Sequence, residues 1–294
     1  MKNSIFTILK KLDLSSEESR KVFSNQTRDV QDLTVWKDDI SDVIFIDEFY
    51  TGVKTYEDGN YRDLNQKKLG LDQPYVYEGH KDAQRRFKEN LGFISGKNVA
   101  DFGCGSGDFL KLIKPYCVNT IGVELELDYV NSLNNLGINC FQNLNDLEDK
   151  SLDVIVSFHV LEHLPDPVKV LIKIKSKIKS GGLVIIEVPH ARDLLLTLGN
   201  ENYKKFTLWS QHLILHTRES LRKLLQFTGF TDVEIEGVQR YPLSNHLNWL
   251  ANGEPGGHKS LLSIIDSDDL SKAYCNSLSK LDHTDTLIAV ARVP

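Results

Sequence analysis

A short apolar strand that runs into three alternate glycines constrains this chain more than any other feature. Residues 98–108 read Asn-Val-Ala-Asp-Phe-Gly-Cys-Gly-Ser-Gly-Asp, and the glycines are Gly103, Gly105 and Gly107. Glycines so placed allow a tight turn, positive φ angles and close approach of a ligand to the backbone. A helix expected from Asp108 would point its first N–H groups at the same place, and Asp101 would end the strand there. The pattern predicts a nucleotide-binding turn at the carboxyl edge of a parallel sheet.

The spacing of the glycines separates two kinds of cofactor. A dinucleotide fingerprint, Gly-x-Gly-x-x-Gly, would need glycine at position 108, where an aspartate would face a pyrophosphate badly. A nicotinamide oxidoreductase is therefore disfavoured. The string Asp-Phe-Gly-Cys-Gly-Ser-Gly instead resembles the first motif of class I S-adenosylmethionine-dependent methyltransferases, whose cofactor has a zwitterionic methionine end and no phosphate.

Strand-like and helix-like segments alternate beyond residue 98, which is typical of a parallel sheet covered on both faces. Strands are predicted at residues 98–102, 120–124, 138–142, 152–158, 183–188, 232–238 and 286–293. Helices are predicted at residues 108–114, 128–134, 167–179 and 218–228, and the glycine pair 181–182 is expected to stop the third of them. The fold class is α/β: a Rossmann-like, doubly wound, seven-stranded and mostly parallel sheet. The resemblance implies that its last strand is antiparallel.

The expected domain organisation is a methyltransferase domain at residues 96–294, with insertions at 190–215 and 239–284. Residues 1–95 are expected to form an N-terminal extension that caps the acceptor side. Small helices are predicted over its first forty residues and a short strand at 42–47. A tyrosine-rich segment follows, which could form one wall of a polar-ligand pocket or an ordinary surface loop.

Composition excludes several classes of function. The net charge is −6 with no basic block, which disfavours a nucleic-acid partner. No apolar run approaches the roughly 20 residues of a membrane span, and the N-terminus has no apolar signal-peptide core, so a cytoplasmic location is expected. The four cysteines are scattered and are expected to be reduced and buried, not to form disulfides or a thiolate zinc site.

The second half of the cofactor site is predicted at the ends of the next strands. Glu124 lies about twenty residues beyond the glycines, where a carboxylate accepts hydrogen bonds from both ribose hydroxyls. A solvated acid at a strand end is the plain alternative. The resemblance implies that adenine lies beside Asn143 and the Leu144 N–H, with Gln142 as an alternative, and that Phe158 lines the mouth at the methyl donor. S-adenosyl-L-methionine is the predicted cofactor.

Residues 156–167 read Val-Ser-Phe-His-Val-Leu-Glu-His-Leu-Pro-Asp-Pro and resemble a segment of small-molecule methyltransferases. Some O-methyltransferases resemble Glu-x-x-Glu-His at this point and hold a divalent ion there. This chain has His159 at the first position, which leaves Glu162, His163 and His212 as candidate ligands of a divalent metal. In the alternative, Glu162 and His163 orient the loop by hydrogen bonds to backbone N–H groups.

Two segments bear on the methyl acceptor. Residues 209–221 look like a segment of sugar methyltransferases, although Gln211 replaces an acid found in C-methylating relatives, which disfavours C-methylation. The insertion at 239–258 is dense in aromatic, amide and glycine residues and resembles methyltransferases associated with surface polysaccharide synthesis. Its residues suit a saccharide acceptor, whose C–H face would stack on Tyr241 or Trp249. A homodimer contact is the alternative.

These patterns predict O-methylation of a small polar acceptor, with a sugar or glycan precursor as the expected class. His212 is the first candidate for the base that removes the hydroxyl proton and His159 the second, with His190 in reserve. Each of these histidines could instead make a structural hydrogen bond. A quinone-like, phosphate-bearing or other small-molecule acceptor and a non-catalytic cofactor-binding subunit are the alternatives for function.

Overall fold

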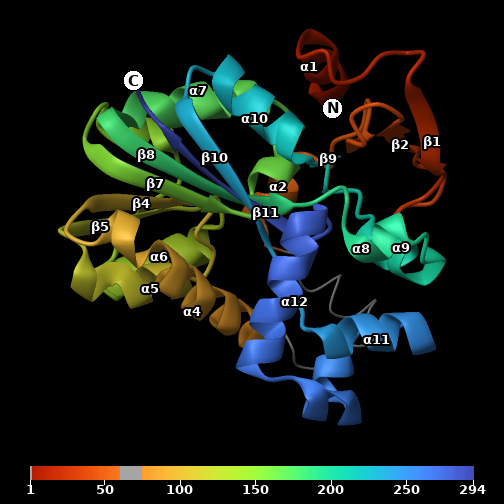
Figure 1. Ribbon diagram of the computed structural model, residues 1–294. Helices are drawn as coiled ribbons and strands as arrows, with labels where there is room; N and C mark the ends of the chain where they lie inside the picture. Colours follow the sequence, from red (N-terminus) through yellow and green to blue (C-terminus); the bar gives the residue numbers. More distant parts are fainter. Residues whose placement is uncertain (1, 60–74) are drawn as a thin grey trace.

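A seven-stranded sheet runs through the centre of the protein in the order β10-β11-β8-β7-β4-β5-β6 (Figure 1). The computed structural model describes residues 2–59 and 75–294. The strands are β4 (Asn98–Phe102), β5 (Asn119–Val123), β6 (Asn139–Phe141), β7 (Leu152–Phe158), β8 (Ile178–Pro189), β10 (Thr231–Val238) and β11 (Thr286–Arg292). Only β11 is antiparallel to both of its neighbours within this sheet. The predicted fold class is confirmed.

One predicted helix stop is wrong. Helix α7 (Pro167–Lys177) ends two residues before its predicted end, and β8 begins at once, so the glycine pair 181–182 lies inside the strand. Gly181 has a φ of +78°, and a Cβ on Gly182 would lie 2.7 Å from the carbonyl oxygen of Asp153. The glycines therefore let β8 pass close to β7 at an irregular step in their pairing, rather than ending the helix.

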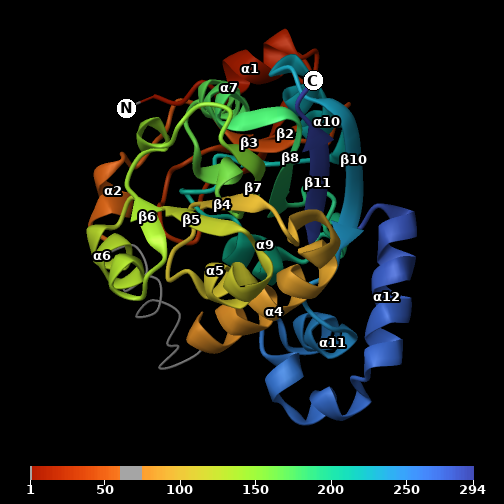
Figure 2. The same cartoon turned by 90° about the vertical axis from the view of Figure 1, so that its left-hand side faces the viewer.

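Helices cover both faces of the sheet (Figure 2). Those on one face are α4 (Tyr75–Ile94), α5 (Asp108–Ile113) and α6 (Leu127–Asn135). Those on the other face are α1 (Ile5–Lys11), α7 and α10 (Arg218–Phe227). The side chains of β4 and β7 alternate accordingly: Val99 and Val154 pack with the first group, and Ala100 and Ile155 with the second. Two apolar layers therefore hold the parallel strands, whose carboxyl ends meet at one edge.

A second, four-stranded sheet replaces part of the predicted N-terminal helices. It is made of β1 (Arg20–Ser24), β2 (Val35–Asp38), β3 (Ile44–Ile46) and β9 (Ile214–Leu215). Helix α1 and the strand near 42–47 are confirmed, whereas helices at β1 and β2 are wrong. Strands β1, β2 and β3 pair in sequence order, whereas the fourth strand, β9, pairs with β3 from about 170 residues further along the chain. Such a partner is invisible to local periodicity.

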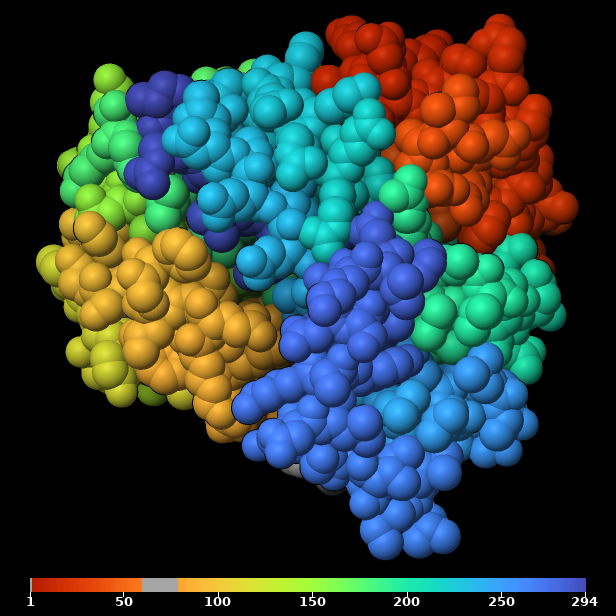
Figure 3. Space-filling view, viewed as in Figure 1, coloured from red at the N-terminus to blue at the C-terminus, as the bar shows by residue number. Residues whose placement is uncertain are grey.

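The remaining elements surround the carboxyl edge of the main sheet. Helix α2 (Lys54–Glu57) follows the second sheet, and α8 (Leu194–Thr197) and α9 (Glu201–Thr207) follow β8. Between β10 and β11 lie α11 (Leu243–Asn252) and α12 (Asp268–Leu281), which form a lobe beside α4 (Figures 1 and 3). Within the described ranges no helix has the length and apolar character that a membrane span requires. A cytoplasmic location stays a prediction.

Truncating one ring in the second sheet tests whether this sheet is part of the core. Phe45 is fully buried and stacks on Phe6 with ring centroids 5.6 Å apart. We expect Phe45→Ala to lower the free energy of unfolding by about 3 to 5 kcal/mol, because the truncation leaves a cavity. The control Ile40→Ala, at an 82% exposed side chain, should change it by less than about 0.5 kcal/mol. Urea denaturation measures both; equal effects would contradict this packing.

Candidate functional site

The glycine turn after β4 is held in place by the end of β5. Gly103, Gly105 and Gly107 have φ angles of +78°, +53° and +73°, as the motif requires. The N–H of Gly105 donates to Glu124 Oε2 at 2.7 Å. A Cβ on Gly103 would lie 2.3 Å from Val160 Cγ2, so the loop after β7 packs directly on the turn. Larger residues would push these two segments apart.

Asp101 lies beneath this turn with only 4% of its surface exposed. Burial, together with the nearby Glu124 carboxylate, raises the pKa of Asp101 to about 7, although the Arg86 charge acts in the opposite direction. A buried carboxyl group with a raised pKa is stabilised in its ionised form by a cationic ligand, because the positive charge of an ammonium group offsets the cost of burying the carboxylate. The site therefore fits a cofactor whose methionine end carries an amine.

The other predicted cofactor residues lie at the carboxyl ends of neighbouring strands. Glu124 accepts the N–H of Glu126 at 3.1 Å as well as that of Gly105, and each carboxylate oxygen keeps a second lone pair for a hydroxyl. Asn143 accepts the Asn145 N–H at 2.8 Å. The positions agree with the sequence prediction, whereas contacts to ribose and adenine stay predictions.

Phe158 and Leu144 have buried side chains in the two apolar layers of the sheet. The ring of Phe158 packs edge-on against Phe109, with centroids 5.1 Å apart, and the Arg86 guanidinium lies 4.6 Å above it. Leu144 therefore offers a ligand its backbone N–H, not its side chain. Phe158 closes the end of β7 where a methyl donor is predicted to lie.

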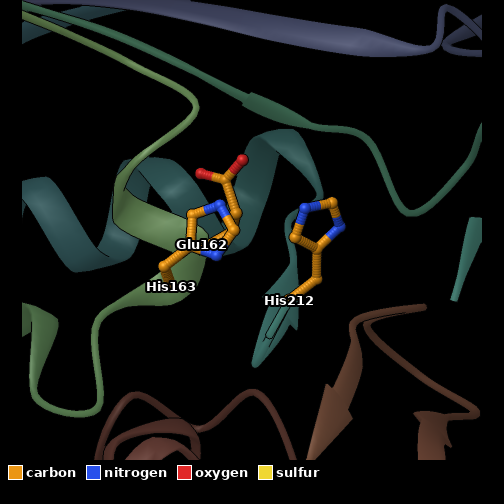
Figure 4. Close-up of side chains that lie close together, drawn as sticks. All are labelled: Glu162, His163 and His212. Atoms are coloured by element: carbon orange, nitrogen blue, oxygen red, sulfur yellow. The ribbon is translucent and has the colours of Figure 1, made fainter. Parts of the chain in front are cut away.

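Three predicted metal ligands, two from the loop after β7 and one from the segment before β9, come together (Figure 4). One ligand atom from each of Glu162, His163 and His212 lies within 4.8 Å of the others. His163 Nδ1 donates to the carbonyl of Gln211 at 2.9 Å, which leaves the Nε2 lone pair available. Glu162 Oε2 is buried and has no hydrogen-bond partner among the described residues. Two histidine lone pairs and a carboxylate oxygen thus form a donor set that fits a divalent cation.

The second sheet positions this cluster. The N–H of Leu213 donates to the Glu162 carbonyl at 2.8 Å, and the N–H of Ile46 in β3 donates to the Leu213 carbonyl at 2.9 Å. The ring of Tyr56 lies edge-on to His163, with centroids 5.8 Å apart. One tyrosine of the predicted wall therefore reaches the cluster, whereas the part of that segment at 60–74 lies outside the described residues.

His159 is held between two buried carboxylates. Its Nδ1 lies 3.2 Å from Glu162 Oε1 and its Nε2 lies 3.2 Å from Glu187 Oε1. Burial and the Arg240 charge oppose protonation, but the two carboxylates outweigh them and raise the pKa of His159. Both ring nitrogens face acids, so His159 is poorly placed to take a proton from an acceptor. The reserve candidate His190 is only 1% exposed and bonds the Thr284 carbonyl, so it does not face an acceptor.

Sequence reasoning missed the role of Glu187, at the end of β8. This carboxylate is fully buried, and the guanidinium groups of Arg85 and Arg86 on α4 bond it at 2.8 and 2.6 Å. The two arginines hold the pKa of Glu187 well below its usual range despite burial. The sequence does show an acid at a predicted strand end and a pair of arginines on a predicted helix. No local pattern indicates that these residues, about a hundred positions apart, form ion pairs.

Trp249 does not provide the predicted stacking surface. It is 2% exposed on α11 and packs against Tyr203 and Phe206. Tyr241 lines a cavity and stays a candidate.

Comparison with known proteins bears on the family. The family model for a methyltransferase domain matches residues 75–235, which is more than half of the chain. The chain belongs to this family. It is an S-adenosylmethionine-dependent methyltransferase, and S-adenosylmethionine is its cofactor. The fold agrees, since this methyltransferase aligns with a solved methyltransferase from Archaeoglobus fulgidus at a TM-score of 0.51 and 22% identity, over 79% of this chain and 99% of that one.

Named relatives of this methyltransferase act on different acceptors. It is 24% identical to a ubiquinone biosynthesis O-methyltransferase from Cupriavidus pinatubonensis, over 53% of this chain and 69% of that protein. It is 25% identical to a tRNA U34 carboxymethyltransferase from Idiomarina loihiensis, over 64% of this chain. The match spans only 61% of that second relative's length. These relatives therefore leave the acceptor open.

Cofactor affinity should depend on pH through Asp101. With a pKa of about 7, this carboxyl group is half ionised at pH 7 and about one-tenth ionised at pH 6. An ammonium-bearing cofactor binds the ionised form, so we expect affinity to fall about fivefold from pH 7 to pH 6. Isothermal titration calorimetry measures this change. The Asp101→Asn variant should bind the cofactor more weakly, and its affinity should no longer change between pH 6 and pH 7. The same pH dependence in that variant would contradict the pairing of Asp101 with the ammonium group.

Proposed function

We propose that this methyltransferase transfers a methyl group to an oxygen of a small polar acceptor that binds beside the Glu162, His163 and His212 cluster. The supporting observation is the packing of Val160 on Gly103, which places the loop that carries Glu162 and His163 directly against the glycine turn. Proton-accepting groups therefore lie next to the predicted cofactor site. In this proposal residues 1–95 cap the acceptor side. The support is that β3 bonds the backbone next to His212 and that the ring of Tyr56 packs against His163.

Each predicted cofactor residue has a role in this proposal. Asp101 pairs with the methionine ammonium, Glu124 accepts the ribose hydroxyls, and Asn143 with the Leu144 N–H faces adenine. Phe158 and the glycines at 103, 105 and 107 shape the contact surface. The bound cofactor supplies a methyl group on a sulfonium, which is already electrophilic. The protein chiefly has to align the two reactants and exclude water.

His212 is the proposed proton acceptor. Burial and the neighbouring His163 hold the pKa of His212 well below its usual range, so the imidazole is neutral near pH 7 and keeps a lone pair. A hydroxyl group is a poor nucleophile, and its proton must leave as the new bond forms. His159 remains the second candidate, although its two carboxylate neighbours make it the weaker one.

A sugar or glycan precursor is the proposed acceptor class, with surface polysaccharide synthesis as the proposed setting. The support is chemical: the insertion after β10 lines a polar cavity with Tyr241, Ser271 and Tyr274. The name of the ubiquinone relative favours a quinone-like phenol as the alternative. A homodimer stays a proposal, and the exposed apolar side chains of Leu261 and Ile264 are the surface available to it.

Replacing His212 tests the base. We expect His212→Ala to slow methyl transfer by about 10² to 10⁴ because general-base assistance is lost. The rate is measured as transfer of labelled methyl from S-adenosylmethionine into the acceptor fraction of a cell extract. Cofactor affinity, measured by calorimetry on the same variant, should stay unchanged. A near wild-type rate in both His212→Ala and His159→Ala would contradict a histidine base.

A metal-assisted reaction is the second candidate, favoured by Glu162 Oε2, which has no hydrogen-bond partner among the described residues, and by His163, whose Nδ1 donates and whose Nε2 therefore keeps its lone pair. A divalent ion held by Glu162, His163 and His212 would lower the pKa of a hydroxyl bound to it. In the same assay, loss of activity with a chelator and recovery with Mg²⁺ or Mn²⁺ would replace the histidine base with this metal. Mn²⁺ binding measured by electron paramagnetic resonance should then weaken in Glu162→Gln but not in Glu148→Gln, at an exposed surface acid.

A further inference from the structure

A cavity of about 400 Å³ lies where α4, the segment after β10 and the start of α12 meet. Its size is within the roughly 300 to 1,000 Å³ range of small-molecule sites. The side chains that matter here are Asp82, Arg240, Tyr241, Asp266, Ser271 and Tyr274. None of these was assigned a hydrogen-bonding role from the sequence. Figure 3 shows the lobe of α11 and α12 that forms one side of this region.

The hydrogen bonds of Gln239 determine the tautomer of a buried histidine beside the cavity. Gln239 Oε1 accepts the N–H of Asp285 at 3.1 Å, which fixes the orientation of the amide. Its Nε2, a group that can only donate, therefore faces His246 Nε2 at 3.2 Å. The same Gln239 nitrogen also donates to the Tyr241 carbonyl and to Asp285 Oδ2, each at 2.9 Å. Because this nitrogen cannot accept a hydrogen bond, its position favours a lone pair on His246 Nε2, which assigns the ring proton to Nδ1.

This tautomer orients the Tyr274 hydroxyl. His246 Nδ1 lies 2.6 Å from Tyr274 Oη, so the ring N–H donates to the phenol oxygen. Burial raises the pKa of Tyr274 to about 12 and lowers that of His246 to about 4, so both groups keep these forms near neutral pH. The hydroxyl proton of Tyr274 is then directed away from His246, and Tyr274 lines the cavity.

The charges around the cavity are compensated within the protein. The guanidinium of Arg240 forms a close ion pair with Asp82. Asp266 accepts the Ser244 hydroxyl at 2.6 Å and the Ser244 N–H at 3.3 Å. Lys81 and Asp268 also lie on the wall, so the described lining carries three carboxylates against two cations, which disfavours an anionic ligand such as phosphate. The remaining hydroxyl groups and the Tyr241 ring suit a neutral molecule with many hydroxyls.

Ion pairs connect the cavity with the proposed methyl-transfer site. Arg85 Nη2 lies 3.4 Å from Asp82 Oδ1 and 2.8 Å from Glu187 Oε2. Glu187 in turn faces His159 at 3.2 Å. Successive contacts therefore link Asp82 on the cavity wall to His159 in the loop after β7.

We propose that this cavity binds the non-reacting part of a neutral, hydroxyl-rich acceptor, and that Tyr274, positioned by His246, donates a hydrogen bond to it. The proposal rests on the proposed function, because it places the acceptor of that same reaction. Tyr274 determines which acceptors bind; it does not touch the methyl group. His246 acts through Tyr274 and is a positioning residue.

Saturation-transfer NMR on the full chain with bound S-adenosylmethionine tests this proposal. The probes are the methyl α-glycosides of glucose, galactose and mannose, with catechol and inorganic phosphate as comparators. We expect at least one glycoside to bind, and Tyr274→Phe to weaken it about threefold to tenfold through loss of one hydrogen bond. The matched control is Tyr116→Phe, at a 48% exposed side chain near the opposite end of β4. Calorimetry should find the same cofactor affinity in all three proteins.

Nitrogen-15 correlation spectra of the histidine rings provide a second readout. They should show His246 protonated on Nδ1 in the wild type, and His246→Asn, whose amide can replace that donor, should bind the glycoside better than His246→Leu. Absence of binding by every glycoside, preferential binding of catechol or phosphate, or an equal affinity in Tyr274→Phe would overturn the proposal. The proposed function fails separately, if labelled methyl is not transferred to any hydroxyl-bearing acceptor.

Discussion

The buried carboxylate of Glu187 is the interaction on which the arrangement of the whole sheet edge depends. It lies near the end of β8 with no exposed surface, and Arg85, Arg86 and His159 surround it. An uncompensated buried charge costs several kcal/mol, so α4 is fixed against the carboxyl ends of the strands for as long as the fold persists. The loop after β7 is fixed by the same group through His159.

Helix α4 consequently contacts both the predicted cofactor site and the cavity beside α12. Arg86 extends over Phe158 and lies close enough to Asp101 to affect its pKa, on the cofactor side. Arg85 contacts Asp82, which pairs with Arg240 on the cavity side. The main sheet forms the edge at which the cofactor is predicted to bind, and in the proposed function the N-terminal sheet and the lobe after β10 surround the acceptor.

Features encoded within a few residues could be predicted, and those made by distant pairs could not. The strand at 98–102, the positive φ angles of the glycines and the position of Glu124 follow from local sequence and were right. Strands β1 and β2 were missed because neither has the strict alternation of buried and exposed residues that identifies a strand from sequence. The two arginine partners of Glu187 lie about a hundred residues away, and the tautomer of His246 depends on an amide whose orientation only the folded chain determines.

We expect the glycine turn and Glu124 to bind the cofactor together. Calorimetric titration of S-adenosylmethionine into the wild-type protein, Glu124→Ala and the exposed-surface control Glu148→Ala tests this expectation. The wild type and the control should bind with micromolar-range or tighter affinity, and Glu124→Ala should bind more weakly by about 1.5 to 3 kcal/mol, or about one to two decades, because charged hydrogen bonds to ribose are lost. Absence of binding to the wild type, or equal affinities in all three proteins, would contradict it.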